Sequence, residues 1–117
     1  MKKFKNVEKA IADFKSGKFV IVVDDKDREN EGDFIISSEK ATPDDINFMI
    51  SVGKGLVCIA VDQEKASKLN LSPMVQQNTG ANETNFTVSV DARINTTTGI
   101  SAKDRWETVQ VILNEKS

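Results

Sequence analysis

The most constraining feature of the sequence is a dense run of charge between two short apolar segments. Phe19–Val23 is a continuous apolar run rich in β-branched residues, and Phe34–Ile36 is a second, shorter one. Between them, eight of the ten residues of Asp24–Asp33 are charged, six of them acids and two of them bases. Short β-branched runs bounded by polar segments are typical of strands. The sequence therefore predicts a strand, an acidic loop and a second strand over residues 19–36.

The apolar composition favours a chain that mixes helices and strands. The length of 117 residues fits one domain, and a hydrophobic fraction of 38% with six glycines is enough for a packed core. Val and Ile supply 22 residues whereas Leu supplies 4, which favours strands over a helix bundle. We expect a single domain over residues 1–117 with an α/β fold of the α+β type, in which helices pack against a mixed β-sheet.

Local start and stop signals predict four helices. Thr42, Asp62 and Ser101 are candidate N-caps, and Asp104, three residues after Ser101, completes the pattern of a capping box. Glycines directly after apolar residues at helical spacing mark helix ends. The expected helices cover Val7–Ser16 with Gly17 as its stop, Pro43–Val52 with Gly53 as its stop, Asp62–Lys68, and the residues from Ser101 to Leu113.

Two further apolar segments predict strands. Leu56–Val61 repeats the pattern of a buried strand, and Phe86–Val90 alternates apolar and polar residues as a half-exposed strand does. Ser72–Asn85 contains Pro and Gly among polar residues, so we expect a long loop there. Loops of that length are usually functional or mobile.

Charge and residue usage exclude several classes of function. A net charge of −2 with interspersed signs gives no basis for binding nucleic acid, and the longest apolar run is too short to span a membrane. One Cys cannot form an internal disulfide, which favours a cytoplasmic protein. The chain has no His, so the commonest general base and transition-metal ligand is absent. Any metal here would take oxygen ligands, which suits Mg²⁺ or Mn²⁺.

The acidic loop is the strongest candidate for chemistry. Six carboxylates in one connection repel one another, and a divalent cation would relieve that repulsion. A calcium-binding EF-hand starting at Asp25 does not fit, because its sixth position is Asn30 and its twelfth is Ile36. A solvated charged turn is the alternative interpretation. Arg28 beside Glu29 and near Asp33 argues for a site, because a guanidinium binds phosphate and the acids bind Mg²⁺ or move protons.

The chain resembles the 3,4-dihydroxy-2-butanone 4-phosphate synthases of riboflavin biosynthesis. The string Asp27–Asp33 is similar to the signature of that family, and further segments follow in the family's order. These segments are Gly55–Cys58, Pro73–Val75, Asn78–Thr79, Phe86–Val88 and Thr97–Arg105. The resemblance extends from about Val7 to Leu113.

The resemblance implies a reaction and roles for residues of the acidic loop. The family converts D-ribulose 5-phosphate to 3,4-dihydroxy-2-butanone 4-phosphate and formate with Mg²⁺ or Mn²⁺, and it forms homodimers. By resemblance, Glu29 is the metal ligand and contacts the substrate together with Arg28 and Asp33. Asp33 is also a candidate catalytic residue. Glu31 and Asp24 are further candidate catalytic acids, and carboxylates that shuttle protons suit a reaction with enolisation and dehydration steps.

Two other segments carry competing interpretations. Cys58 lies in an apolar stretch where a small buried side chain is the simpler expectation, although the family tends to carry Cys there near its active site. It therefore stands as a candidate catalytic residue. Thr97, Thr98 and Ser101 precede the last expected helix, where they could face a phosphate or act simply as caps.

The sequence also departs from the family pattern. Ser37 replaces a usual Pro, Ser51–Val52 a usual basic pair, and Gln76 a usual Glu, and Ala81–Glu83 differs from the family's loop. The family's His-bearing segments, which supply its second metal ligand and phosphate contacts, have no counterpart here. The chain is therefore expected to be either an incomplete part of the synthase domain or a complete short homologue with altered function. We expect weak Mg²⁺ binding and little or no turnover by this chain alone, and exposed apolar surface that promotes dimerisation or aggregation. The alternative function is a non-catalytic subunit that binds sugar phosphate, metal or a partner chain.

Overall fold

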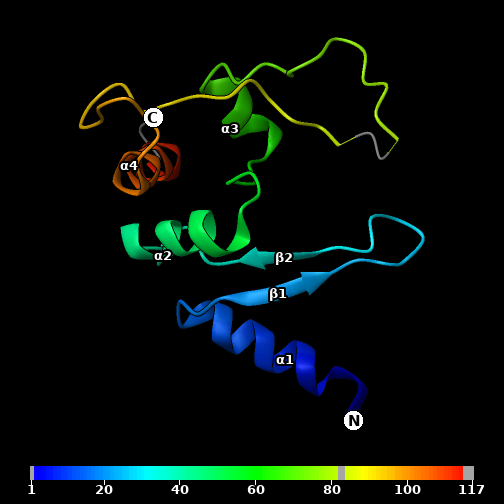
Figure 1. The fold of residues 1–117 in the computed structure, drawn as a ribbon. Coiled ribbons are helices and arrows are strands. Elements are labelled where there is room, and N and C mark those ends of the chain that lie inside the picture. Colours follow the sequence, from blue (N-terminus) through cyan, green and yellow to red (C-terminus); the bar gives the residue numbers. More distant parts are fainter. Residues whose placement is uncertain (1, 82–83, 115–117) are drawn as a thin grey trace. The chain divides into compact units, whose positions relative to one another are not determined.

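A computed structural model describes residues 2–81 and 84–114 of the chain. The chain divides into two compact units, residues 1–57 and residues 58–117, each with its own internal contacts. Figure 1 shows helices together with a short sheet, and the expected α+β class is confirmed. No helix of the described residues is long and apolar enough to cross a membrane.

The first unit opens with helix α1, Lys2–Lys15. The helix begins earlier than the expected Val7, because the lysines that precede Val7 are good helix formers. Gly17 ends it as predicted, with a φ of 85° that favours glycine. The Gly17 N–H donates to the Phe14 carbonyl at 3.1 Å and the Lys18 N–H to the Asp13 carbonyl at 2.9 Å. This pair of bonds is a Schellman motif.

The sheet of the described residues is an antiparallel pair of strands, β1 (Val20–Val23) and β2 (Gly32–Ile35). Val20 pairs with Ile35 and Val23 with Gly32, so the expected second strand begins two residues earlier than Phe34. No parallel pairing that would make this sheet mixed is present in residues 2–81 and 84–114. Figure 1 shows α1 beside β1 and α2 beside β2.

The second helix of this unit changes its winding at the end. Helix α2 (Pro43–Phe48) continues directly into a π-helical turn, η1 (Met49–Gly53). Thr42 caps α2 through a complete capping box with Asp45, which confirms the predicted start. The predicted end near Gly53 is also confirmed, and Lys54 follows it with a left-handed φ of 58°.

Three aromatic rings form the core of the first unit. The ring centres of Phe19 and Phe34 are 6.0 Å apart, those of Phe19 and Phe48 5.1 Å, and those of Phe34 and Phe48 5.3 Å. These rings join the residue before β1 to β2 and α2, and Ile46 of α2 is buried. Beyond this cluster β1 is open to solvent, with Ile21 66% and Val23 71% exposed. The expectation of a buried first strand is therefore wrong, because one two-stranded hairpin cannot cover both of its faces.

The second unit contains helices α3 (Gln63–Lys68) and α4 (Ala102–Leu113). Asp62 and Ser101 accept hydrogen bonds from backbone N–H groups in the first turn of these helices, so both predicted N-caps are confirmed. The Lys65 ammonium of α3 donates to the Asn114 carbonyl at 3.1 Å, which ties α3 to the end of α4.

Two predicted strands are absent from the second part of the chain as described. Residues 56–61 form no strand in the described part of the chain, and the half-buried Val57 is flanked by the exposed Leu56 and Cys58. In the expected strand Phe86–Val90, only Thr87 forms a bridge, to Pro73. Strands need a partner for their backbone groups, and neither segment has a continuous one among the described residues. The predicted loop Ser72–Asn85 is confirmed, except that residues 82–83 lie outside the description.

Candidate functional site

The acidic segment forms the connection between β1 and β2. Strand pairing is extended by one bond from the Asp24 N–H to the Glu31 carbonyl at 3.3 Å. The Asp25 carbonyl then accepts bonds from the Arg28 and Asn30 N–H groups, and Asn30 has a left-handed φ of 53°. Asn tolerates this conformation better than most residues. The loop is thus a defined turn that lifts residues 24–31 beyond the ends of the strands (Figure 1).

Asp24 is the most highly connected side chain of this loop. Its Oδ1 accepts a hydrogen bond from the Glu31 N–H at 2.9 Å, and its Oδ2 accepts one from the Glu29 N–H at 2.9 Å. The Arg28 Nη1 also donates to Oδ2 at 3.1 Å. The Glu31 N–H, followed by the Glu29 N–H and the Arg28 guanidinium, holds the pKa of Asp24 below its ordinary value against the effect of burial.

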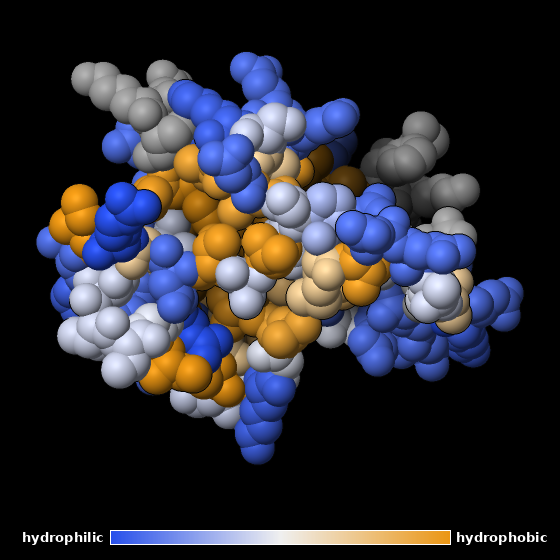
Figure 2. Space-filling view, turned by 90° about the horizontal axis from the view of Figure 1, so that it is seen from above, coloured by the Kyte–Doolittle hydropathy of each residue, from blue (hydrophilic) through white to orange (hydrophobic). Residues whose placement is uncertain are grey.

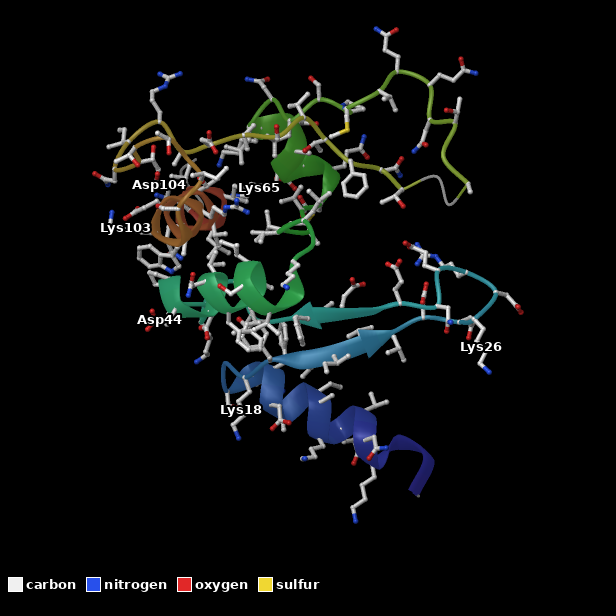
Figure 3. All side chains as sticks on the ribbon, in the orientation of Figure 1. Lys18, Lys26, Asp44, Lys65, Lys103 and Asp104 are labelled. Atoms are coloured by element: carbon white, nitrogen blue, oxygen red, sulfur yellow. The ribbon has the colours of Figure 1, made fainter. Side chains whose placement is uncertain are left out.

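Arg28 and Glu29 form the next contact of the site. Arg28 Nη1 lies 2.8 Å from Glu29 Oε1, while the same nitrogen contacts Asp24. The side chains remain accessible, 53% for Arg28 and 37% for Glu29. One guanidinium nitrogen therefore links two carboxylates, and the remaining N–H groups of Arg28 are open to an anionic ligand. Lys26, at the same loop, extends away from it (Figure 3).

The other predicted site residues differ in their placement. Glu31 is exposed directly before β2, and Asp33 is exposed within β2 opposite Val22. The structure therefore brings Asp24, Arg28, Glu29 and Glu31 into one loop, with Asp33 on the adjoining strand. Cys58 belongs to the second unit and is exposed, so the expectation of a small buried side chain is wrong.

The residues of the loop fit a cation held by few protein ligands. Within the described ranges, no three acidic or cysteine side chains are grouped so that they could hold a metal ion. Mg²⁺ usually keeps several waters and takes one or two carboxylates together with substrate oxygens. Glu29 suits this mode, because Arg28 contacts only its Oε1 and the side chain is partly exposed. Asp24 does not, because hydrogen-bond donors already occupy both of its oxygens.

A second carboxylate organises the turn before α4. Asp104 is 3% exposed, and its Oδ2 accepts bonds from the Thr97 N–H at 3.1 Å, the Thr97 hydroxyl at 2.7 Å and the Gly99 N–H at 2.9 Å. Figure 3 shows Asp104 at the start of α4. The expected capping box is thus half formed: Ser101 caps the Asp104 N–H, but the Asp104 carboxylate turns to the preceding loop. Two N–H groups that could have faced a phosphate are occupied by the protein's own anion.

The long loop of the second unit borders an open pocket of about 450 Å³. Its lining includes Pro73, Met74, Asn78 and Phe86. Two backbone bonds hold its two sides together, from Met74 N–H to the Phe86 carbonyl at 2.9 Å and from Val88 N–H to the Ser72 carbonyl at 2.8 Å. None of the predicted catalytic or metal-binding residues lines this pocket.

Comparison with known proteins identifies the family of this chain. Residues 8–117 match the model of 3,4-dihydroxy-2-butanone 4-phosphate synthase. The chain belongs to that synthase family. The resemblance seen in Asp27–Asp33 and the later segments is thereby confirmed.

Relatives of this synthase family are similar over almost the entire chain. The riboflavin biosynthesis protein RibBA of Bacillus mycoides is 54% identical over 114 residues, which are 97% of this chain and 28% of the relative. The RibBA protein of Bacillus velezensis is 51% identical over the same shares. The chain therefore spans about a quarter of the length of these relatives.

Solved synthase structures share the fold. RibBX, a two-domain synthase from A. baumannii, is 47% identical with a TM-score of 0.85, covering 95% of this chain and 32% of its own. A synthase in complex with two magnesium ions is 41% identical with a TM-score of 0.88, covering 93% of this chain and 51% of its own.

Sequence reasoning missed the structural role of two acids, Asp24 and Asp104. Both were candidates for other tasks, but both accept backbone N–H bonds from residues in the same turn. An aspartate directly after a strand, or in the first turn of a helix that follows a turn rich in Thr and Gly, is a signal for this role because Asp commonly bonds nearby backbone groups.

Proposed function

We propose that this chain acts in riboflavin biosynthesis as a 3,4-dihydroxy-2-butanone 4-phosphate synthase. The reaction is the conversion of D-ribulose 5-phosphate to 3,4-dihydroxy-2-butanone 4-phosphate and formate, with Mg²⁺ or Mn²⁺ as cofactor. Family membership over residues 8–117 supports this assignment. The single structural observation that carries it is the Glu29 carboxylate held 2.8 Å from the Arg28 guanidinium in an accessible loop.

The proposed roles follow from the hydrogen-bond donors and acceptors that each side chain leaves available for a ligand. Arg28 offers its remaining N–H groups to the anionic sugar phosphate, and Glu29 offers a carboxylate oxygen to the cation and the substrate. When bound, the cation supplies Lewis-acid stabilisation of charge that develops on substrate oxygens. Glu31 and Asp33 are exposed carboxylates at the start of β2, where they can accept and return protons during enolisation and dehydration. Cys58, an exposed thiol of the second unit, remains a candidate catalytic residue.

The proposal includes a homodimer in the cytoplasm. The structural support for the homodimer is the apolar surface of β1, where Ile21, Val22 and Val23 are all exposed. Apolar side chains are also visible at the surface in Figure 2, among hydrophilic ones. Exposed apolar patches of this kind mark interaction surfaces in soluble proteins.

Formate release from D-ribulose 5-phosphate in the presence of Mg²⁺ tests the function directly. The expected result is turnover that EDTA stops and that Glu29→Gln reduces by at least about 100-fold, because a metal ligand and an ion-pair partner are lost together. Asp27→Asn is the matched control, since Asp27 is an exposed acid of the same loop. Slow turnover supports the proposal equally well, provided that it depends on Glu29. Turnover that Glu29→Gln leaves unchanged would contradict it.

The same surface supports a second candidate, a non-catalytic subunit that binds sugar phosphate, metal or a partner chain. The observation that favours it is the apolar face of β1, which is exposed and available for a partner. Retained binding of D-ribulose 5-phosphate without any formate release would favour this candidate over the synthase.

A further inference from the structure

We infer that Asp24 is a positioning residue whose carboxylate holds the backbone of the acidic loop in the conformation that presents Glu29 and Glu31. This inference deepens the proposed function and rests on it for the roles of Glu29 and Glu31. The contacts on which it is based belong to the described first unit alone.

The contacts of Asp24 are directed at the main chain of the two residues that it presents. Each carboxylate oxygen accepts one backbone N–H at 2.9 Å, from Glu31 at Oδ1 and from Glu29 at Oδ2. The two donor N–H groups are separated by one residue, Asn30, so the carboxylate fixes the backbone on both sides of it. Asn30 itself has a left-handed φ of 53°, which turns the chain between these two backbone positions.

Asp24 also determines where the charge of Arg28 lies. The Arg28 Nη1 donates to Asp24 Oδ2 at 3.1 Å and contacts Glu29 Oε1 at 2.8 Å. Because the same nitrogen bridges both carboxylates, Asp24 orients the guanidinium that in turn orients the Glu29 side chain. Asp24 thus restrains both the backbone and the side chain of Glu29.

The Asp24 carboxylate is poorly suited to proton transfer. A proton on either oxygen would place an O–H against an N–H donor and break at least one of the three bonds. Glu31 and Asp33 carry no such bonds from the protein in the described residues, so their carboxylates are the freer ones for proton transfer.

Hydrogen exchange of the Glu29 and Glu31 amides tests the positioning role without reference to activity. Three variants of the full chain are compared by NMR with the parent: Asp24→Ala, Asp24→Asn and, as control, Asp27→Asn. We expect Asp24→Ala to speed exchange of both amides about tenfold or more, because both lose a charge-assisted acceptor. Asp24→Asn retains one carbonyl oxygen and should keep part of the protection. Unchanged exchange in Asp24→Ala would overturn the inference, and Asp24→Asn gives the same test if the alanine variant does not fold.

A Mg²⁺ titration in the presence of D-ribulose 5-phosphate adds a functional readout. Loss of a supporting contact behind a metal ligand typically costs about 10- to 100-fold in affinity. We therefore expect a loss of about tenfold in Asp24→Ala, a smaller loss in Asp24→Asn and none in Asp27→Asn. An unchanged affinity in both Asp24 variants, with formate release equally abolished in the two, would instead assign Asp24 to proton transfer. If the parent chain releases no formate, the proposed synthase activity fails, and the exchange and titration results still decide the role of Asp24.

Discussion

The Thr97 hydroxyl donates a 2.7 Å hydrogen bond to the buried carboxylate of Asp104. The same oxygen accepts the Thr97 and Gly99 N–H groups, so one carboxylate closes the turn that leads into α4. Removal of its charge should therefore destabilise the second unit. We predict that Asp104→Asn lowers the Tm by about 5 °C or more in thermal unfolding followed by circular dichroism.

A matched control for this variant lies on the same helix. Glu107 forms a 3.7 Å ion pair with the exposed Lys103. Pairs of this kind contribute little, so Glu107→Gln should leave the Tm almost unchanged. Equal Tm values for Asp104→Asn and Glu107→Gln would show that the turn does not depend on Asp104.

The stability contributed by Asp104 should disappear in acid. The Thr97 hydroxyl, followed by the Gly99 and Thr97 N–H groups, lowers the pKa of the Asp104 carboxyl in the folded chain against the effect of burial. A group whose folded pKa is lowered stabilises the fold above its unfolded pKa, about 3.9 for Asp, and loses that effect as the pH falls through the folded value. Urea unfolding at pH 6, 5, 4 and 3 should show the parent and Asp104→Asn converging below about pH 4. A gap that stays constant across this range would refute the assignment.

Gly99 should resist replacement for two separable reasons. Its φ of 90° strains any residue with a Cβ, and a Cβ there would collide with the carboxylate of Asp91. Gly99→Ala is expected to destabilise the chain by about 2 kcal/mol or more in urea unfolding. The double variant Gly99→Ala/Asp91→Ala should recover part of this loss by removing the collision, and the strain in φ should remain. Full recovery would mean that φ contributes nothing, and no recovery would exclude the collision.

The aromatic core of the first unit should depend more on Phe34 than on Phe48. Both rings contact Phe19 and each other, but Phe34 is less exposed than Phe48, which is 40% exposed. We predict that Phe34→Ala costs about 3 kcal/mol of unfolding free energy and that Phe48→Ala costs less. Chemical denaturation of the two variants checks the order, and a larger loss for Phe48→Ala would place the core elsewhere.

The apolar face of β1 should promote self-association. Ile21 and Val23 lie on the same face of the strand and are 66% and 71% exposed. Replacing both by Lys removes little buried area, so the fold should persist, but association seen by analytical ultracentrifugation at micromolar concentration should decrease. A parent chain that sediments as a monomer at this concentration would contradict the expectation.

Local signals predicted the parts of the fold that depend on neighbouring residues. Thr42, Asp62 and Ser101 cap helices as expected, and Gly17 ends α1, because each of these acts within one helical turn. The acidic connection between β1 and β2 was likewise evident from the change of polarity at Asp24. The expected strands at 56–61 and 86–90 failed because pairing depends on segments distant in sequence, which periodicity does not reveal.

The residues that form the candidate site could be predicted from the sequence, but the role of each residue could not. Arg28 and Glu29 were expected side by side, and the structure adds the 2.8 Å contact between them. That Asp24 bonds two backbone amides instead of standing free could not be read from spacing, because it requires the left-handed turn at Asn30. The exposure of Cys58 also depends on what covers the segment, which its apolar neighbours do not specify.

The most direct test of the account is a calorimetric titration of Mg²⁺ with and without D-ribulose 5-phosphate, in the parent chain, Glu29→Gln and Asp27→Asn. A single carboxylate is expected to hold Mg²⁺ loosely, so we predict weak binding without the sugar phosphate and clearly tighter binding with it in the parent and in Asp27→Asn. Glu29→Gln should lose the tighter binding. If Mg²⁺ binds identically in all three proteins, or if the sugar phosphate has no effect on the parent, the acidic loop is not the metal-dependent substrate site proposed here.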